Sequence, residues 1–253
     1  MTRTTDTDRL RARFPAPGAL SGLTIALVCV DEAENLPDAV RYATAAARRC
    51  AIAHEIVLVD DGSDDECVAV AGAIASRDPL VRLVVHAESR GYGDAVRSAI
   101  AAARMPWLLL ADADVQLDFA DLEGFLPAAA AADLVVGWRV MPQGPVAARA
   151  EAALWNRFVR AALELPVRDV DCAFRLGRRE LLTRLDLRAS GALVGAELLV
   201  KSRAAGARTA EAPVHQKAPV AGRDATRRPR LRAGTLRELV DLRRAVRDRP
   251  VGS

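Results

Sequence analysis

The sequence is poor in aromatic residues, cysteine and lysine. Aromatic residues make up 4% of the 253 positions, which argues against a protein that binds single-stranded nucleic acid by stacking bases on rings. The four cysteines stand apart with no paired spacing, which argues against a zinc ribbon or a disulfide framework and favours reduced, mostly buried thiols. Only Lys201 and Lys217 are lysines among 36 basic residues, so arginine carries nearly all of the positive charge.

Long hydrophobic runs are also missing. No stretch reaches the ~18 uninterrupted apolar residues of a membrane span, and the longest uncharged run, residues 14–30, contains two prolines and two glycines. The N-terminus mixes both charges and lacks the apolar core of a signal peptide. A hydrophobic content of 51% still provides for a sizeable core, which excludes wholesale disorder. We therefore expect a folded, cytoplasmic protein.

Excess positive charge is confined to the C-terminal end. Residues 221–253 hold ten arginines and four acidic residues, a balance of +6, whereas the whole chain has a net charge of +3. A nearly neutral body with a basic tail argues against a nucleic-acid-binding protein. The same tail contains an apolar stripe formed by Leu236, Leu239, Val240, Leu242 and Val246.

Two interpretations of this tail stay open. In the first, its arginines face anionic lipid headgroups and its stripe lies at a membrane interface or on a partner protein, which would place the protein on the cytoplasmic face of a membrane. In the second, the stripe packs against the main domain and the basic face is solvated.

Apolar strand-like runs alternate with alanine-rich helical stretches from Leu23 onward. Strands are expected at 23–30, 55–59, 81–85, 107–111 and 133–138, with helices between them at 35–49, 65–77, 92–104 and 119–131. This alternation predicts an α/β fold with a mostly parallel sheet and helices on both faces. We expect a flexible tail over residues 1–22, one domain over 23–220, and a basic tail with an amphipathic helix over 221–253.

Acidic residues cluster where three of the expected strands end. They are Asp31, Glu32 and Glu34 after the first strand, Asp60, Asp61, Asp64 and Asp65 after the second, and Asp112 and Asp114 after the fourth. In a parallel sheet, ligands bind beyond the carboxyl ends of the strands. Helix caps explain one or two such acids, but acids in three loops together favour a functional site. There, a divalent cation or hydrogen-bond donors would relieve the repulsion between the carboxylates.

The most specific pattern is Asp112-Ala-Asp114-Val-Gln116. In an extended chain, residues two apart point the same way, so these three side chains would present oxygen atoms on one side. Hard cations such as Mg²⁺ and Mn²⁺ take oxygen ligands and couple carboxylates to substrate phosphates. A second pattern, Asp60-Asp61-Gly62-Ser63, is typical of a turn or cap, or of a carboxylate that accepts hydrogen bonds from a nucleobase or ribose.

Six short motifs in order carry a resemblance to a known family. They are residues 30–36 (VDEAENL), 59–63 (VDDGS), 90–93 (RGYG), 112–116 (DADVQ), 133–139 (DLVVGWR) and 168–175 (RDVDCAFR). In this order and spacing the chain resembles family 2 glycosyltransferases over roughly residues 23–217, and most of all the dolichyl-phosphate mannose synthase and polyprenyl-phosphate glycosyltransferase group.

This resemblance implies a GT-A (Rossmann-like) domain that binds a nucleotide-sugar and Mg²⁺ or Mn²⁺. Metal ligands would be Asp112, Asp114 and Gln116. Glu32 and Asp60 would contact the nucleoside, with Asp61, Arg90 and Gly91 beside them in the donor site. Arg139 and Arg175 would lie around phosphates, where a guanidinium binds two oxygens at once.

The chain departs from the family pattern at three places. Val30 stands where a base-stacking tyrosine is usual, Ser89 replaces the asparagine before Arg90, and Cys172-Ala173 replaces Ser-Gly before Phe174. The first departure bears on which nucleobase is bound, and the last on the geometry of the acceptor. The membrane spans that some relatives append are absent from this sequence.

The expected reaction is inverting transfer of a sugar from a GDP- or UDP-sugar to a polyprenyl-phosphate acceptor. Such an acceptor is already anionic and needs no strong general base, whereas a hydroxyl acceptor needs one, for which Asp169 and Asp171 are the candidates. His215 is expected near the acceptor. Two alternatives stay open: transfer to a hydroxyl of a small molecule or glycan, and a non-catalytic protein that binds nucleotide-sugars.

Overall fold

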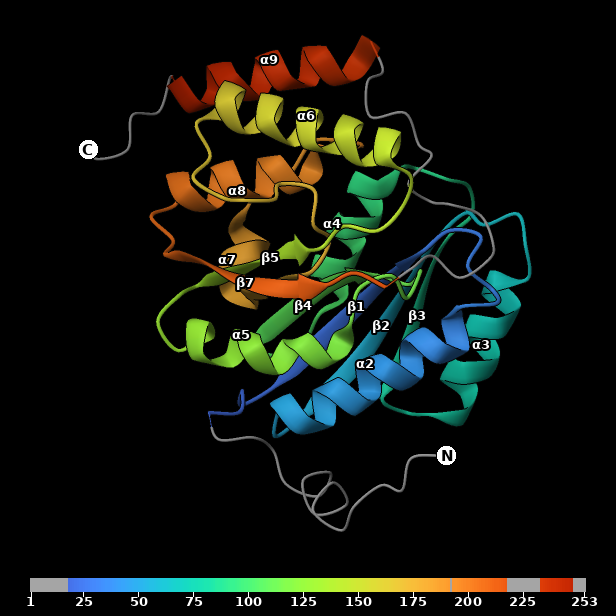
Figure 1. Cartoon of the computed structure of the whole chain (residues 1–253). Coiled ribbons are helices and arrows are strands. Elements are labelled where there is room, and N and C mark those ends of the chain that lie inside the picture. Colours follow the sequence, from blue (N-terminus) through green and yellow to red (C-terminus); the bar gives the residue numbers. More distant parts are fainter. Residues whose placement is uncertain (1–17, 192, 218–232, 248–253) are drawn as a thin grey trace.

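Figure 1 shows the computed structural model, which describes residues 18–191, 193–217 and 233–247. A seven-stranded sheet forms the centre, in the order β3-β2-β1-β4-β6-β5-β7. All strands are parallel except β6, which is antiparallel to both of its neighbours. The strands are β1 (Leu23–Cys29), β2 (His54–Asp61), β3 (Val81–His86), β4 (Trp107–Asp112), β5 (Leu134–Val140), β6 (Arg175–Arg178) and β7 (Thr209–His215).

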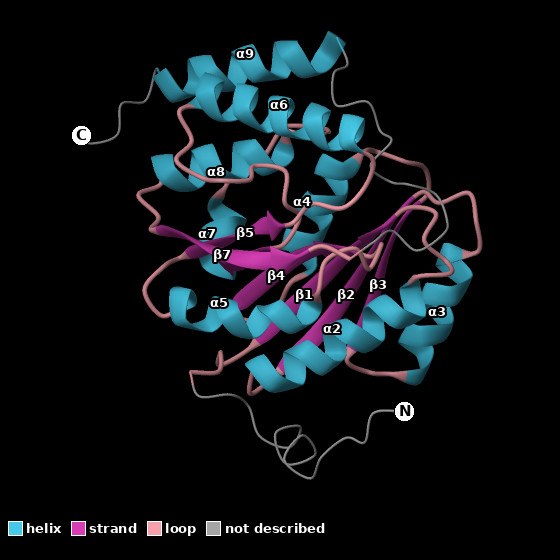
Figure 2. Cartoon of the chain, viewed as in Figure 1, coloured by secondary structure: helices cyan, strands magenta, loops and turns pink. Residues whose placement is uncertain are grey.

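Helices cover both faces of the sheet, as the layers in Figure 2 make plain. One face packs against α2 (Leu36–Cys50), α3 (Cys67–Arg77) and α5 (Leu122–Ala129), which follows a 3₁₀ turn at Phe119–Asp121. The other face packs against α4 (Tyr92–Ala102), α6 (Val146–Leu163), α7 (Arg179–Arg184), α8 (Val194–Ala204) and α9 (Ala233–Arg247). The predicted α/β class with a mostly parallel sheet is confirmed.

The central strand explains why this layering forms. Every residue of β1 is buried, and its side chains alternate between the two cores: Leu23, Ile25 and Leu27 face α2, α3 and α5, while Ala26 and Val28 face the opposite layer. Because the side chains of a strand alternate in direction, a run that is apolar throughout fits only a sheet covered on both faces.

Strand β6 was not predicted. Its sequence, Arg175-Leu-Gly-Arg178, carries a charge at each end and lacks the long apolar run of the other strands. It nevertheless joins β4 to β5, with Leu110 opposite Arg175 and Val136 also opposite Arg175. The charged side chain at the first position is accommodated because it lies in the functional site described below.

The ends of the chain are described only in part. Leu20 is buried and forms a bridge with Ala51 at the edge of the domain. In α9, Leu239 and Leu242 are buried and the helix contacts α6 and α8, whereas Val240 is 48% exposed. The basic residues 221–232 lie outside the described residues. No helix in the described part of the chain combines the length and apolar character that a membrane crossing requires.

Candidate active site

The acidic ends of three strands meet at one edge of the sheet. In the register of the sheet, Cys29 at the end of β1 lies opposite Asp60 of β2, and Val28 lies opposite Asp112 of β4. Glu32 follows β1 in the loop above them. The strand β2 extends two residues further than predicted, so Asp60 and Asp61 belong to the strand itself and both are fully buried.

Asp60 closes the turn after β2. Its Oδ1 accepts hydrogen bonds from the backbone N–H groups of Gly62 and Ser63, both at 3.1 Å, and its Oδ2 accepts one from the Ser63 hydroxyl at 2.5 Å. Gly62 has φ +68°, and a Cβ there would lie 2.3 Å from the backbone nitrogen of Ser89, so the turn requires glycine. The turn interpretation of this motif therefore holds, and contact with a nucleoside stays a proposal.

Asp61 positions the loop that begins α4. Its Oδ1 accepts hydrogen bonds from His86 Nδ1 at 2.7 Å and from the Arg90 N–H at 2.9 Å. Its Oδ2 accepts from the Ser89 hydroxyl at 3.0 Å and the Gly91 N–H at 2.9 Å. Burial raises the pKa of Asp61, but these donors outweigh it and hold the pKa below its usual value. Asp61 is thus an anchor for the predicted donor-site residues Arg90 and Gly91.

Glu32 carries the clearest electrostatic signature of the edge. It is 7% exposed, and its Oε2 accepts a hydrogen bond from Asn35 Nδ2 at 2.7 Å. Burial raises the pKa of Glu32, Asn35 opposes the rise, and the charges of Asp112, Asp65 and Asp31 add to it. The carboxylates of three loops therefore repel one another, as expected of a site that a cation completes.

The motif at the end of β4 does not have the extended shape that the sequence analysis assumed. The strand ends at Asp112, and the chain then turns through Val115, which has φ +58°. Asp114 Oδ1 accepts a hydrogen bond from the Gln116 N–H at 3.1 Å, and Gln116 Oε1 accepts one from Gln216 Nε2 at 3.3 Å. Asp112 accepts a hydrogen bond from the Tyr92 hydroxyl, whereas the amide of Gln116 binds Gln216, which follows β7.

Tyr92 is a site residue that the sequence analysis did not single out. Its hydroxyl donates a hydrogen bond to Asp112 Oδ1 at 2.9 Å. Burial raises the pKa of Tyr92 well above its usual value, Asp112 and Asp114 add to the rise, and Arg175 opposes it. The two carboxylates and the buried arginine therefore all act electrostatically on this hydroxyl. Its place in the RGYG motif was the available signal.

Arg175 is buried behind this group, with 4% exposure. Its Nη2 donates to the Val170 carbonyl at 2.7 Å, and its Nε has no hydrogen-bond partner among the described residues. The guanidinium packs on Gly195 at the start of α8, where a Cβ would lie 2.2 Å from Nη2. A buried guanidinium whose Nε is unpaired among the described residues is suited to an anion.

Arg139 and Asp169 form an ion pair with each other. Arg139 Nε and Nη2 donate to the two oxygens of Asp169 at 2.7 and 2.9 Å. Burial raises the pKa of Asp169, but the hydrogen bonds and charge of Arg139 outweigh it and lower the pKa. Asp169 is consequently a weak proton acceptor in this arrangement. Similarly, His215 is exposed and pairs with Asp121, its Nδ1 lying 3.0 Å from Oδ1.

Similarity to known proteins identifies the family of this chain. The profile of "Glycosyl transferase family 2" matches residues 24–185. The chain belongs to glycosyltransferase family 2. It is 29% identical to glycosyltransferase AglD of Haloferax volcanii over 80% of this chain and 34% of AglD. It is also 29% identical to an undecaprenyl-phosphate 4-deoxy-4-formamido-L-arabinose transferase of Pseudomonas fluorescens over 66% of this chain and 50% of that protein.

A solved structure shares the fold. Glucosyl-3-phosphoglycerate synthase of Mycobacterium tuberculosis, in complex with Mn²⁺, UDP-glucose and phosphoglyceric acid, superposes with a TM-score of 0.65 at 17% identity, covering 91% of this chain and 81% of that one. The fold of this family 2 enzyme is therefore GT-A. The chain spans a third to a half of the length of the two relatives above.

Proposed function

We propose that this enzyme transfers a sugar from a nucleotide-sugar to a polyprenyl-phosphate acceptor with inversion, in a metal-dependent reaction. The observation that carries the proposal is that carboxylates and a buried guanidinium act on the same hydroxyl: Asp112 accepts a hydrogen bond from Tyr92, and the charges of Asp112, Asp114 and Arg175 all shift the pKa of Tyr92. Asp112 also raises the pKa of Glu32. The proposed catalytic domain comprises residues 23–220.

The carboxylate edge fits a hard divalent cation. Its ligand atoms are oxygens, which Mg²⁺ and Mn²⁺ prefer. The pKa of Glu32 is raised by burial and by the negative charge of Asp112, and a cation would offset that charge. Asp112 and Asp114, with Gln116 beside them, would hold the ion. When bound, it would compensate the negative charge of the diphosphate leaving group. The binding of Mn²⁺ and UDP-glucose by the synthase that shares the fold is consistent with this role.

The chain's own residues supply the rest of the donor site. Asp61 fixes the N–H groups of Arg90 and Gly91, so the loop at the start of α4 is rigid before any ligand arrives. Glu32 and Asp60, at the ends of neighbouring strands, are the proposed contacts of the nucleoside.

The choice of a phosphate acceptor rests on the acid–base groups. Attack on the anomeric carbon builds positive charge on the sugar, and a hydroxyl nucleophile must lose a proton to a base. Of the two candidate bases, Asp169 has a lowered pKa and both oxygens bound to Arg139, and Asp171 Oδ1 accepts a hydrogen bond from Trp155 Nε1 at 3.3 Å. A phosphate nucleophile needs no such base, and Arg175, whose buried Nε is unpaired among the described residues, is its proposed partner. The undecaprenyl-phosphate transferase among the relatives adds support.

The test is transfer of radiolabel from a panel of GDP- and UDP-sugars to polyprenyl phosphate. We expect an acid-labile product that extracts into organic solvent and forms only when the lipid phosphate is present. A water-soluble glycoside made instead from a hydroxyl acceptor would assign the alternative reaction. Binding of a nucleotide-sugar with no transfer to any acceptor of either class would indicate a non-catalytic binding protein.

A further inference from the structure

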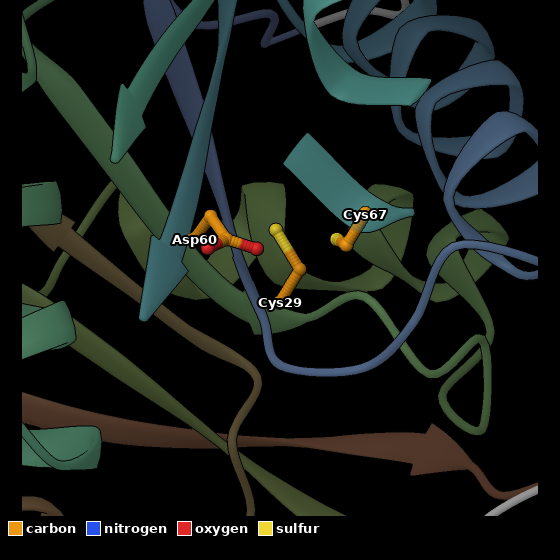
Figure 3. Close-up of side chains that lie close together, drawn as sticks. All are labelled: Cys29, Asp60 and Cys67. Carbon is orange, nitrogen blue, oxygen red and sulfur yellow. The ribbon is translucent and has the colours of Figure 1, made fainter. Parts of the chain in front are cut away.

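Two thiols and one carboxylate converge beneath the turn after β2. Cys29 ends β1, Asp60 lies opposite it in the sheet register, and Cys67 begins α3. One ligand atom from each residue lies within 4.8 Å of the other two, and all three residues have 0% exposure. Figure 3 shows the two sulfur atoms and the carboxylate grouped between the strands and the start of the helix.

The backbone around this group is tied together by the protein itself. The Asp31 N–H donates to the Ser63 hydroxyl at 3.0 Å, and the Asp64 N–H donates to Asp31 Oδ1 at 2.9 Å. Asp65 accepts from the Cys67 N–H at 2.9 Å and from the Ala33 N–H at 3.1 Å. The loops that carry the three side chains are therefore held in register, so the group is formed before any ligand binds.

The ligand chemistry of this group differs from that of the carboxylate edge. Thiolate sulfur selects thiophilic cations, whereas Asp112 and Asp114 offer only oxygen. Two sulfurs and one carboxylate oxygen match the ligand types of zinc sites, which place sulfur about 2.3 Å and oxygen about 2.0–2.2 Å from the ion. We propose that Cys29, Asp60 and Cys67 form a second metal site, specific for a thiophilic divalent cation such as Zn²⁺.

Binding of the cation releases two protons and leaves the group with one net negative charge. Both thiols lose their protons to solvent, and the resulting ligand charge of two thiolates and one carboxylate exceeds the charge of the cation by one. A carboxylate has about four acceptor positions, and Asp60 uses three of them within its turn. It can therefore bind the cation while keeping these hydrogen bonds. A water molecule or the adjacent Ser63 hydroxyl would complete a tetrahedral site.

An effect of this metal site on donor binding rests on the proposed function. If Asp60 contacts the nucleoside of the donor, a cation bound to Asp60 would weaken donor binding. Binding of a thiophilic metal would then reduce the affinity of the donor site, independently of the Mg²⁺ or Mn²⁺ that supports transfer.

The site is tested with the metal alone, on the reduced full-length chain. The thiolate-to-metal charge-transfer band produced by Cd²⁺ or Co²⁺ should saturate at one ion per chain, with release of two protons, whereas ions bound at the carboxylate edge contribute no such band. Cys29→Ser and Cys67→Ser should each weaken binding by more than the ~10–100-fold that loss of an outer-shell partner costs. Cys50→Ser and Cys172→Ser, which alter the other two buried cysteines, should leave the band unchanged.

Folding and function are separated by two further measurements. Circular dichroism checks that each variant folds. Cadmium-113 NMR of the native chain reports sulfur ligation even if a serine variant fails to fold. Absence of a thiolate band in the native chain, or its persistence in both Cys29→Ser and Cys67→Ser, would overturn the site. A band accompanied by unchanged donor affinity would keep the site and reject the nucleoside role of Asp60.

Discussion

The Tyr92 hydroxyl donates a hydrogen bond to Asp112 Oδ1 across 2.9 Å, and this contact joins the start of α4 to the end of β4. Because the tyrosine is buried beside two carboxylates, its pKa is raised and it stays a donor. Its hydrogen bond fixes the orientation of a proposed metal ligand. We therefore propose Tyr92 as a positioning residue for the proposed metal.

Tyr92→Phe should raise the metal concentration needed for half-maximal turnover by about 10–100-fold, the usual effect of losing a partner that orients a ligand. Saturating Mn²⁺ should recover most of the activity. Tyr42→Phe, which alters the other tyrosine, is the control and should keep the native metal dependence. A Tyr92→Phe enzyme with native metal dependence and reduced turnover would assign tyrosine a different role.

Loss of a metal ligand should be far more severe. Asp114→Ala removes a carboxylate from the proposed metal site, which should lower turnover by at least ~100-fold because charge compensation at the leaving group is worth a few kcal/mol. Glu180→Ala, at an exposed ion pair with Arg184, should behave like the native enzyme. Full turnover of the native enzyme in excess EDTA would refute the metal requirement.

Arg175→Lys tests which phosphate the buried guanidinium serves. Lysine keeps the charge but lacks the planar fork that binds two oxygens, so turnover should fall at least ~10-fold while calorimetric affinity for the donor stays near native. Arg178→Lys, on the same strand but 45% exposed at its side chain, controls for general effects on β6. Lost donor affinity in Arg175→Lys would move this residue to the donor site.

The ion pair between Arg139 and Asp169 should make stability depend on acid pH. The pKa of Asp169 is lowered in the folded protein, so its contribution is complete above the unfolded value of about 3.9 and is lost as the pH falls through the folded pKa. Arg139→Gln should reduce the free energy of unfolding by about 1–3 kcal/mol at neutral pH, between the values for exposed and buried pairs.

Urea unfolding across pH checks this expectation. The difference in the free energy of unfolding between native protein and Arg139→Gln should be largest at neutral pH. It should fall as acid protonates Asp169, first in the variant, where Arg139 no longer opposes the effect of burial, and then in the native protein. Arg184→Gln, at an exposed pair, should change stability by less than about 0.5 kcal/mol. A difference that is independent of pH down to the acid transition would mean that Asp169 does not carry the effect.

The parts of the fold that could be predicted are those that local pattern determines. Strand β1 is apolar at every position, and a run of this kind between helical stretches has few other solutions than a covered parallel strand. The clustering of acids at one edge also followed, because parallel strands end at the same edge. These inferences required no knowledge of contacts between distant residues.

Two of the missed features depend on such contacts, and the third depends on a local turn. Arg139 and Asp169 are 30 positions apart, and nothing local indicates that one neutralises the other. Arg175 is buried in a short strand because Val170 and Gly195 receive its guanidinium. The chain turns at Val115, where the sequence analysis assumed an extended chain, because Asp114 Oδ1 accepts a hydrogen bond from the Gln116 N–H. Local hydrogen bonding overrode strand continuation there.

The basic segment before α9 gives the last prediction. It lies outside the described residues, but α9 buries Leu239 and Leu242 against the domain, so truncating the chain would disturb packing as well as charge. Substitution of arginines by glutamine removes only the charge. The residues to change are Arg223, Arg227, Arg228, Arg230 and Arg232.

We expect the native protein to co-sediment with anionic vesicles at low salt and to be released at high salt, because exposed charges are screened. Each arginine near the surface contributes ~1 kcal/mol, so the fivefold variant should partition at least ~100-fold more weakly while keeping its affinity for the nucleotide-sugar. The control replaces five exposed arginines elsewhere with the same change in net charge: Arg41, Arg48, Arg77, Arg184 and Arg188. Equal binding by both variants would show that total charge, and not this segment, holds the protein to the membrane.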